Sequence, residues 1–173
     1  MNPKRKGGAF ERVVAKALSL WVSRNQHDDL LWRSATSGGR ATVASQKGKR
    51  VKTGMGDIVA VERHREANIL INDFIIECKN VKNLRWDALL YGTPTSGQTI
   101  LPFWKKLLEE STRHNKSPML IAKQNGADPV VCIQRKVKHL SPLLVCYRFE
   151  NPIFIYDLED LCTGVTFSAF CRL

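Results

Sequence analysis

Two acidic residues and one lysine stand at the ends of apolar segments, where their side chains could serve hydrolytic chemistry. In FIIECKN (74–80), side chains alternate along an extended strand, so Glu77 and Lys79 share one face. Asp57 begins a second apolar segment, DIVAVE (57–62). If the two strands are neighbours, we expect both carboxylates to lie at one end of a sheet.

This combination of groups suits a divalent metal ion and a phosphodiester. The carboxylates of Asp57 and Glu77, with the main-chain carbonyl of Cys78, would offer the oxygen ligands that Mg²⁺ prefers. Lys79 could orient or help deprotonate an attacking water and stabilise charge on phosphorus, while the metal supplies Lewis acidity. We therefore predict phosphodiester hydrolysis with Mg²⁺, for which Mn²⁺ can substitute.

The acid-x-Lys pattern does not identify such a site by itself. A strand end closed by a salt bridge between Glu77 and Lys79, with Asp57 capping a turn, would give the same pattern. The context favours a site, because the strand is strongly apolar and a Gly-Asp strand start lies twenty residues upstream. Both interpretations remain open at this level.

The balance of charge favours a polyanionic partner. Lys and Arg number 27 against 16 Asp and Glu, which gives a net charge of +11. A membrane surface would need a basic amphipathic helix with exposed apolar anchors, so nucleic acid is the better fit. One acid-free segment is especially basic and predicts a loop that contacts DNA, or else a solvated loop of no consequence: Arg33, Arg40, Lys47, Lys49, Arg50 and Lys52.

The composition sets bounds on the fold and on other functions. A chain of 173 residues, 43% of them hydrophobic, predicts one domain with its own core. It has no apolar run long enough to span a bilayer and no secretory signal, so we expect a cytoplasmic protein without membrane contact.

Five cysteines without a CxxC pair and four scattered histidines do not support a disulfide framework or a zinc enzyme. No Gly-rich nucleotide loop is found, so no nucleotide cofactor is expected.

The hydrophobic periodicity predicts an α/β (α+β) fold with a central mixed β-sheet flanked by helices. Glu11 lies on the boundary of the apolar stripe of the first helix, where it could face a cleft or be an ordinary solvated glutamate. We expect a turn over 64–68 and one long or two short strands over 69–79. The predicted helices are 7–25 and 101–114, and the other predicted strands are 30–35, 57–62, 117–124, 129–136, 143–149, 153–158 and 166–173.

Taken together, GDIVA and FIIECK resemble the motif of the PD-(D/E)XK nuclease superfamily, with Gly56 in place of the usual Pro. Within it, the chain resembles archaeal-type and phage-encoded Holliday junction resolvases. The further matches are KGGAFER around Glu11, RSATSGGR around Ser37, and SPMLIAKQNG. The resemblance covers roughly 4–125 and implies a restriction-endonuclease-like core over about 4–134. A β-rich extension of open role is expected over about 135–173.

The resemblance implies a homodimer that binds a four-way DNA junction, each subunit cutting one strand. It implies that Asp57 and Glu77 are metal ligands, Glu11 a further acid near the metal, Lys79 the catalytic lysine and Ser37 an active-site contributor. The residues expected to hold phosphates are Lys4, Arg5, Lys6, Arg33, Arg40, Lys47, Lys49, Arg50, Lys52, Lys105 and Lys106.

Two alternatives to a junction nuclease stay open. The first is a repair or restriction-type nuclease of the same superfamily that acts on duplex or damaged DNA. The second is a basic DNA-binding module that keeps the fold without catalysis. Cleavage of a four-way junction, a fork and a linear duplex distinguishes them.

Overall fold

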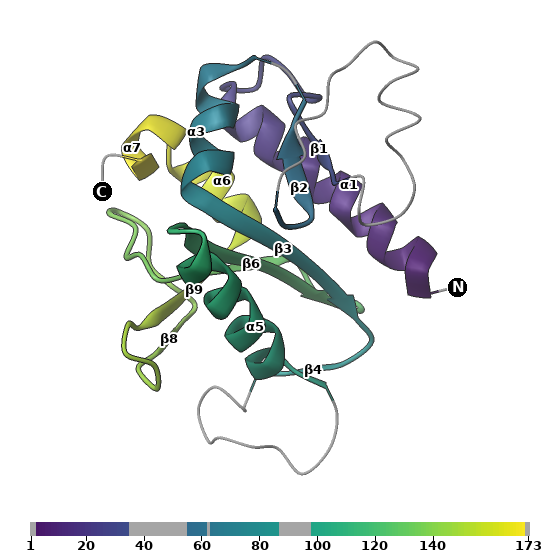
Figure 1. Cartoon of the computed structure of the whole chain (residues 1–173), viewed down its shortest axis with the longest axis vertical. Helices are drawn as coiled ribbons and strands as arrows, with labels where there is room; N and C mark the ends of the chain where they lie inside the picture. Colours follow the sequence, from purple (N-terminus) through teal and green to yellow (C-terminus); the bar gives the residue numbers. More distant parts are fainter. Residues whose placement is uncertain (1–2, 35–54, 62, 87–97, 172–173) are drawn as a thin grey trace.

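The computed structural model of the chain describes residues 3–34, 55–61, 63–86 and 98–171. The helices are α1 (Pro3–Val22), α3 (Arg65–Asp73), α5 (Ile100–Arg113), α6 (Leu158–Gly164) and α7 (Phe167–Cys171). The strands are β1 (Leu31–Arg33), β2 (Ile58–Ala60), β3 (Phe74–Val81), β4 (Leu84–Arg85), β5 (Gln98–Thr99), β6 (Ser117–Gln124), β7 (Val130–Ile133), β8 (Leu144–Cys146) and β9 (Ile153–Asp157). Figure 1 shows their arrangement.

A five-stranded sheet forms the centre of the fold, in the order β3-β6-β7-β9-β8. The β3–β6 pair is parallel and the remaining pairs are antiparallel, which makes the sheet mixed. Parallel neighbours need a long crossover, and α5 lies on the connection between β3 and β6 (Figure 1). The short β1–β2 pair is antiparallel and separate from this sheet. The predicted α/β class with a mixed sheet is confirmed.

Helices cover both faces of the sheet, so that two hydrophobic clusters form. On one face α5 places Trp104 and Leu107 against inward side chains of the strands, among them Ile75 and Leu120. On the other face α1 packs with α3, α6 and α7 over the opposite side chains, such as Ile76. Alternation along β3 therefore decides which cluster each of its residues joins.

The apolar stripe of α1 packs against the C-terminal part of the chain. The indole Nε1 of Trp21 donates a hydrogen bond to the Val165 carbonyl at 2.7 Å. The Trp21 ring also meets Phe167 and Phe170 edge-on, at centroid distances of 5.1 and 5.0 Å. Sequence segments about 145 residues apart thus share one core, as the buried cluster on this face shows.

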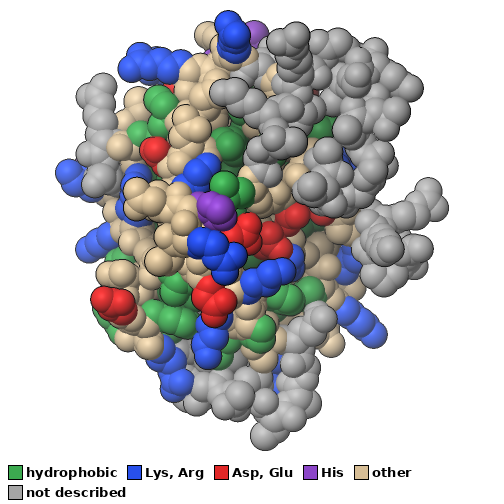
Figure 2. All heavy atoms as spheres, in the orientation of Figure 1, with side chains coloured by type: hydrophobic (Ala, Val, Ile, Leu, Met, Phe, Trp, Pro, Cys, Tyr) green, Lys and Arg blue, Asp and Glu red, His purple; other side chains and the backbone are tan. Residues whose placement is uncertain are grey.

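The surface in this orientation carries basic side chains at many separate places, while acidic side chains gather in fewer (Figure 2). Acidic and basic groups lie side by side near the centre of this face. No helix in the described ranges has the length and apolar character needed to cross a membrane.

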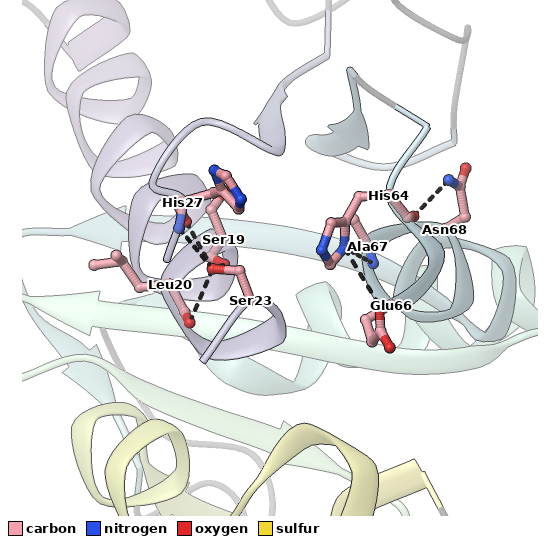
Figure 3. A network of polar contacts seen from close by, with 8 residues as sticks. All are labelled: Ser19, Leu20, Ser23, His27, His64, Glu66, Ala67 and Asn68. Atoms are coloured by element: carbon pink, nitrogen blue, oxygen red, sulfur yellow. Dashed lines mark hydrogen bonds and ion pairs between the residues drawn. The ribbon is translucent and has the colours of Figure 1, made fainter. Parts of the chain in front are cut away.

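The predictions of a turn over 64–68 and of strands starting at Ile69 are wrong, because 65–73 form α3 and β3 begins at Phe74. His64 caps the helix: its Nδ1 accepts a hydrogen bond from the Ala67 N–H at 3.5 Å, as Figure 3 shows. Ala67 and Leu70 then bury one helical face. A short segment rich in Ile and Leu is compatible with a strand or with a buried helix, and here the His64 cap favours the helix.

The C-terminal segment also differs from the prediction of a β-rich extension. Strands β8 and β9 confirm the two expected β segments in shortened form, but the predicted last strand over 166–173 is wrong. Asp157 caps α6 by accepting hydrogen bonds from the Glu159 and Asp160 N–H groups. Phe167 and Phe170, three residues apart, lie on one face of α7 and are buried.

Candidate active site

Asp57 lies against the open edge of β3, the edge opposite β6. Its N–H donates a hydrogen bond to the Ile76 carbonyl at 2.8 Å, and its Oδ2 accepts one from the Cys78 N–H at 2.9 Å. The N–H and C=O of one residue in an extended strand point to the same edge, so the Cys78 carbonyl also points to the Asp57 side. The segment that begins at Asp57 is therefore a neighbour of β3, as the sequence predicts.

Gly56 makes this close approach possible. Its φ is +83°, a left-handed backbone that residues with a Cβ rarely adopt. A Cβ at this position would also lie 2.6 Å from the Ile76 carbonyl oxygen, which is far inside van der Waals contact. The missing side chain thus sets the path of the chain immediately before Asp57.

Glu77 and Lys79 point from β3 to the same side of the sheet as Ile75, toward α5. The Lys79 Nζ forms a hydrogen-bonded ion pair with Glu77 Oε1, and it lies 5.5 Å from the centroid of the Phe103 ring. Burial acts to lower the pKa of Lys79, but the hydrogen bond and the attraction of Glu77 outweigh it and raise the pKa. Lys79 is therefore a cation at neutral pH.

Glu11 reaches the same region from α1 and is almost fully buried. Its Oε2 forms an ion pair with Arg33 Nε at 2.7 Å, and both side chains are about nine-tenths or more buried. The Arg33 guanidinium lies against α1 so closely that a Cβ at Gly8 would be 2.6 Å from Nη1. The helix glutamate is thus held in the interior by a charge partner, and the reading of a solvated surface glutamate is wrong.

The acids influence one another strongly enough to perturb Asp57. Burial, together with repulsion from Glu77 and Glu11, raises the pKa of Asp57 to about 6. The hydrogen bond from Cys78 and the positive charge of Lys79 act in the opposite direction. Glu77, Glu11 and Lys79 therefore all lie within electrostatic reach of Asp57, and perturbed pKa values of this kind cluster at functional sites.

This perturbed pKa predicts that stability depends on pH. Since the folded state holds the Asp57 proton more tightly than the unfolded state, the free energy of unfolding should fall as pH rises from about 4 to about 6. Asp57→Asn removes this dependence. Relative to wild type, it should gain on the order of 1 to 3 kcal/mol across that window.

Urea unfolding at pH 4 and pH 7, in EDTA to exclude divalent ions, measures this gain. The matched control is Asp128→Asn, which replaces an exposed carboxylate by the same amide. Equal gains for the two variants would contradict the assigned burial and repulsion at Asp57.

The residues at the edge of β3 fit a hydrated divalent ion. Asp57 Oδ2 and Glu77 Oε1 each have a protein donor, while the second oxygen of each carboxylate has no donor within the described ranges. Mg²⁺ is commonly held by one or two carboxylates plus waters and substrate oxygens, so these two acids suffice. The part of the chain that the structure describes holds no cluster of three His, Cys, Asp or Glu arranged as a metal site. Glu11, the further acid that the resemblance implies, has its Oε2 in the ion pair with Arg33.

Several predicted residues lie outside what the structure describes. These are Ser37, Arg40, Lys47, Lys49, Arg50, Lys52 and the side chains of Lys4 and Arg5. Among the described residues, Lys6 donates a hydrogen bond to the Asn125 side chain. Lys105 and Lys106 are exposed on α5, whereas Arg33 is buried. Sequence reasoning missed the pairing of Arg33 with Glu11, because no periodicity links a helix to a strand 22 residues away. The roles of all these residues stay predictions.

Comparison with known proteins adds independent findings. Residues 2–161 match the family model described as phage putative PDDEXK endonuclease. The chain is also 26% identical over 162 residues to the type IV secretion system protein PtlH of Bordetella pertussis and to its homologs in Bordetella parapertussis and Bordetella bronchiseptica. That similarity covers 90% of this chain but only 45% of each relative, so the chain spans less than half of their length. No solved structure gives a significant match.

Proposed function

This chain belongs to the phage putative PDDEXK endonuclease family, and from that membership we propose that it is a Mg²⁺-dependent DNA endonuclease that cuts four-way junctions. The observation that carries the proposal is the meeting of Asp57, Glu77 and Lys79 at the open edge of β3. The family membership confirms the resemblance to the PD-(D/E)XK nucleases, and it supports a nuclease activity with DNA as the substrate class.

Asp57 and Glu77 would hold the ion through the carboxylate oxygens that protein donors leave open. The bound ion would supply Lewis acidity and offset negative charge at the scissile phosphate. It would also relieve the repulsion that raises the pKa of Asp57, because a cation favours the charged form of a carboxylate. The site is therefore electrostatically prepared for a cation.

Lys79 acts as a donor and a positive charge in this proposal. Its raised pKa keeps the ammonium protonated at neutral pH, so it orients the attacking water and stabilises the oxygens around phosphorus rather than accepting a proton. Its Nζ lies over the Phe103 ring, 5.5 Å from the centroid, an arrangement that favours the charged ammonium. The ion pair with Glu77 holds the ammonium beside the ligand carboxylate.

The proposed preference for four-way junctions rests on the resolvase-like segments around Glu11 and Ser37 and on the net charge of +11. A junction has two-fold symmetry, so two active sites of a homodimer would cut two opposed strands. Phosphate contacts that ignore sequence would read the shape of the junction. Preference for linear duplex instead would place the chain with the repair or restriction-type nucleases.

A cleavage assay tests this proposal with a four-way junction, a fork and a linear duplex that share arm sequences. We expect paired nicks near the junction centre in Mg²⁺, at a rate at least about tenfold above that of the duplex, and no cleavage in EDTA. Equal cleavage of junction and duplex would contradict the junction preference alone. Binding of all three without cleavage in Mg²⁺ or Mn²⁺ would leave only the DNA-binding module.

A further inference from the structure

A cavity of about 1010 Å³ lies at the beginning of β3, away from the acidic site. Phe74 and Ser117 line it from the starts of two parallel strands, and 134–141, the loop that follows β7, forms the rest of its wall. The lining contains no acidic residue. We call its four basic members, which come from this loop, the basic groove: Arg135, Lys136, Lys138 and His139.

The loop is fixed by contacts that point inward at alternate residues. The Val137 N–H donates a hydrogen bond to the Tyr156 hydroxyl at 2.8 Å, and the Val137 side chain is buried. Arg135 donates from Nη1 to the Phe170 carbonyl at 3.0 Å, and its guanidinium lies 5.3 and 5.2 Å from the Phe74 and Phe170 ring centroids. The Arg135 side chain and the Val137 backbone therefore hold the loop on both sides of Lys136.

Lys136 and Lys138, on either side of the buried Val137, are exposed. In the described part of the chain, neither lysine forms an ion pair with a carboxylate. Fixing the loop in advance lowers the ordering cost of binding, and unpaired ammonium groups need not give up a partner. Both features favour an anionic ligand.

The groove continues beyond the first cavity. A second cavity of about 490 Å³ shares Lys138 and His139 with it and reaches the end of α6 and the start of α7. There the hydroxyls of Thr166 and Ser168 add hydrogen-bonding groups. Two adjoining hollows along one basic loop suit an extended polyanion better than a single small anion.

We propose that the basic groove binds the phosphate backbone of a duplex DNA arm outside the segment that is cut. The proposal rests on the proposed function in taking DNA as the ligand. Phe74 precedes Cys78 by four residues of one strand, or about 13 Å at the rise of a β-strand. A duplex advances 3.4 Å per base pair, so an arm would span this separation in about four base pairs.

Fluorescence anisotropy in EDTA, with the whole chain and a labelled 30-base-pair duplex, tests the groove. The variant is Lys136→Gln with Lys138→Gln. The matched control, Arg63→Gln with Arg65→Gln, removes the same charge from two exposed positions, one just before α3 and one at its first residue. We expect the groove variant to bind about tenfold more weakly and its slope of log K against log salt to fall by about 2, since each phosphate contact contributes about 1.

Equal losses in the two variants would overturn the groove proposal, because a general loss of charge would then explain both. A single-phosphate site is tested by adding inorganic phosphate at constant ionic strength. If DNA affinity were the same in wild type and the groove variant, while phosphate raised the Tm of wild type alone, the loop would be a site for free phosphate and the DNA assignment would be overturned. The binding assay contains no divalent ion, so its result does not depend on cleavage. A chain that binds DNA through the groove in EDTA but does not cut in the separate assay with Mg²⁺ would contradict only the proposed function.

Discussion

Asp57→Asn is expected to lower the rate of DNA cleavage at least about a thousandfold, while the affinity for DNA in EDTA changes by less than about threefold. The amide keeps the size of the side chain and can still accept the hydrogen bond from the Cys78 N–H. It cannot offer a charged oxygen to the ion. The expected loss therefore concerns metal-assisted chemistry and not the fold.

Thermal unfolding supplies a second readout that does not depend on cleavage. Mg²⁺ at ten or more times its dissociation constant should raise the Tm of wild type, because it binds only the folded state, and should leave Asp57→Asn unchanged. Asp128→Asn, which alters an exposed carboxylate, serves as the control and should behave as wild type in both measurements. If Asp57→Asn also abolished DNA binding, Asp57 would be a structural residue and the assignment as metal ligand would fail.

Gly56→Ala is expected to lower the free energy of unfolding by about 3 kcal/mol or more and to reduce cleavage strongly. Two costs combine at this position. The backbone φ of +83° is strained for alanine, and the new methyl group would lie 2.6 Å from the Ile76 carbonyl oxygen. Any shift that relieves this clash also moves Asp57 away from β3.

Gly126 offers a matched control within the same chain. Its φ is +75°, but a Cβ there would meet no atom within 4 Å. Gly126→Ala should therefore cost only the backbone strain, on the order of 1 kcal/mol, and leave cleavage intact. Urea unfolding of both variants separates the two costs. Similar losses for both would show that the contact with Ile76 does not constrain Asp57.

The strands and helices with clear periodicity could be predicted from the sequence, whereas elements decided by a cap or by packing could not. The alternation around Glu77 and the stripe on α1 each point to one element type. Helix α3 depends on the His64 cap, and α7 depends on aromatic packing against Trp21. Such contacts are tertiary and override a local preference for extended structure.

Within the site, local sequence sufficed for the residues that end strands. Asp57, Glu77 and Lys79 could be found because charge interrupts an apolar run, which is costly unless something requires it. The ion pair between Glu11 and Arg33 could not be inferred, since it depends on how α1 crosses β1. The fixed loop that carries Lys136 and Lys138 was also missed, because its anchors at Tyr156 and Phe170 lie far along the chain.

The left-handed backbone at Gly56 bears on how the chain can be compared with others. The PD-(D/E)XK motif is written with proline at this place, yet the proline ring fixes φ near −65° and Gly56 has +83°. The two residues therefore enter the following strand along different backbone routes. A glycine here aligned with a proline in another chain would therefore mark a difference in backbone geometry. Replacing Gly56 by the proline of the motif would change the turn before Asp57 and would not restore an ancestral form.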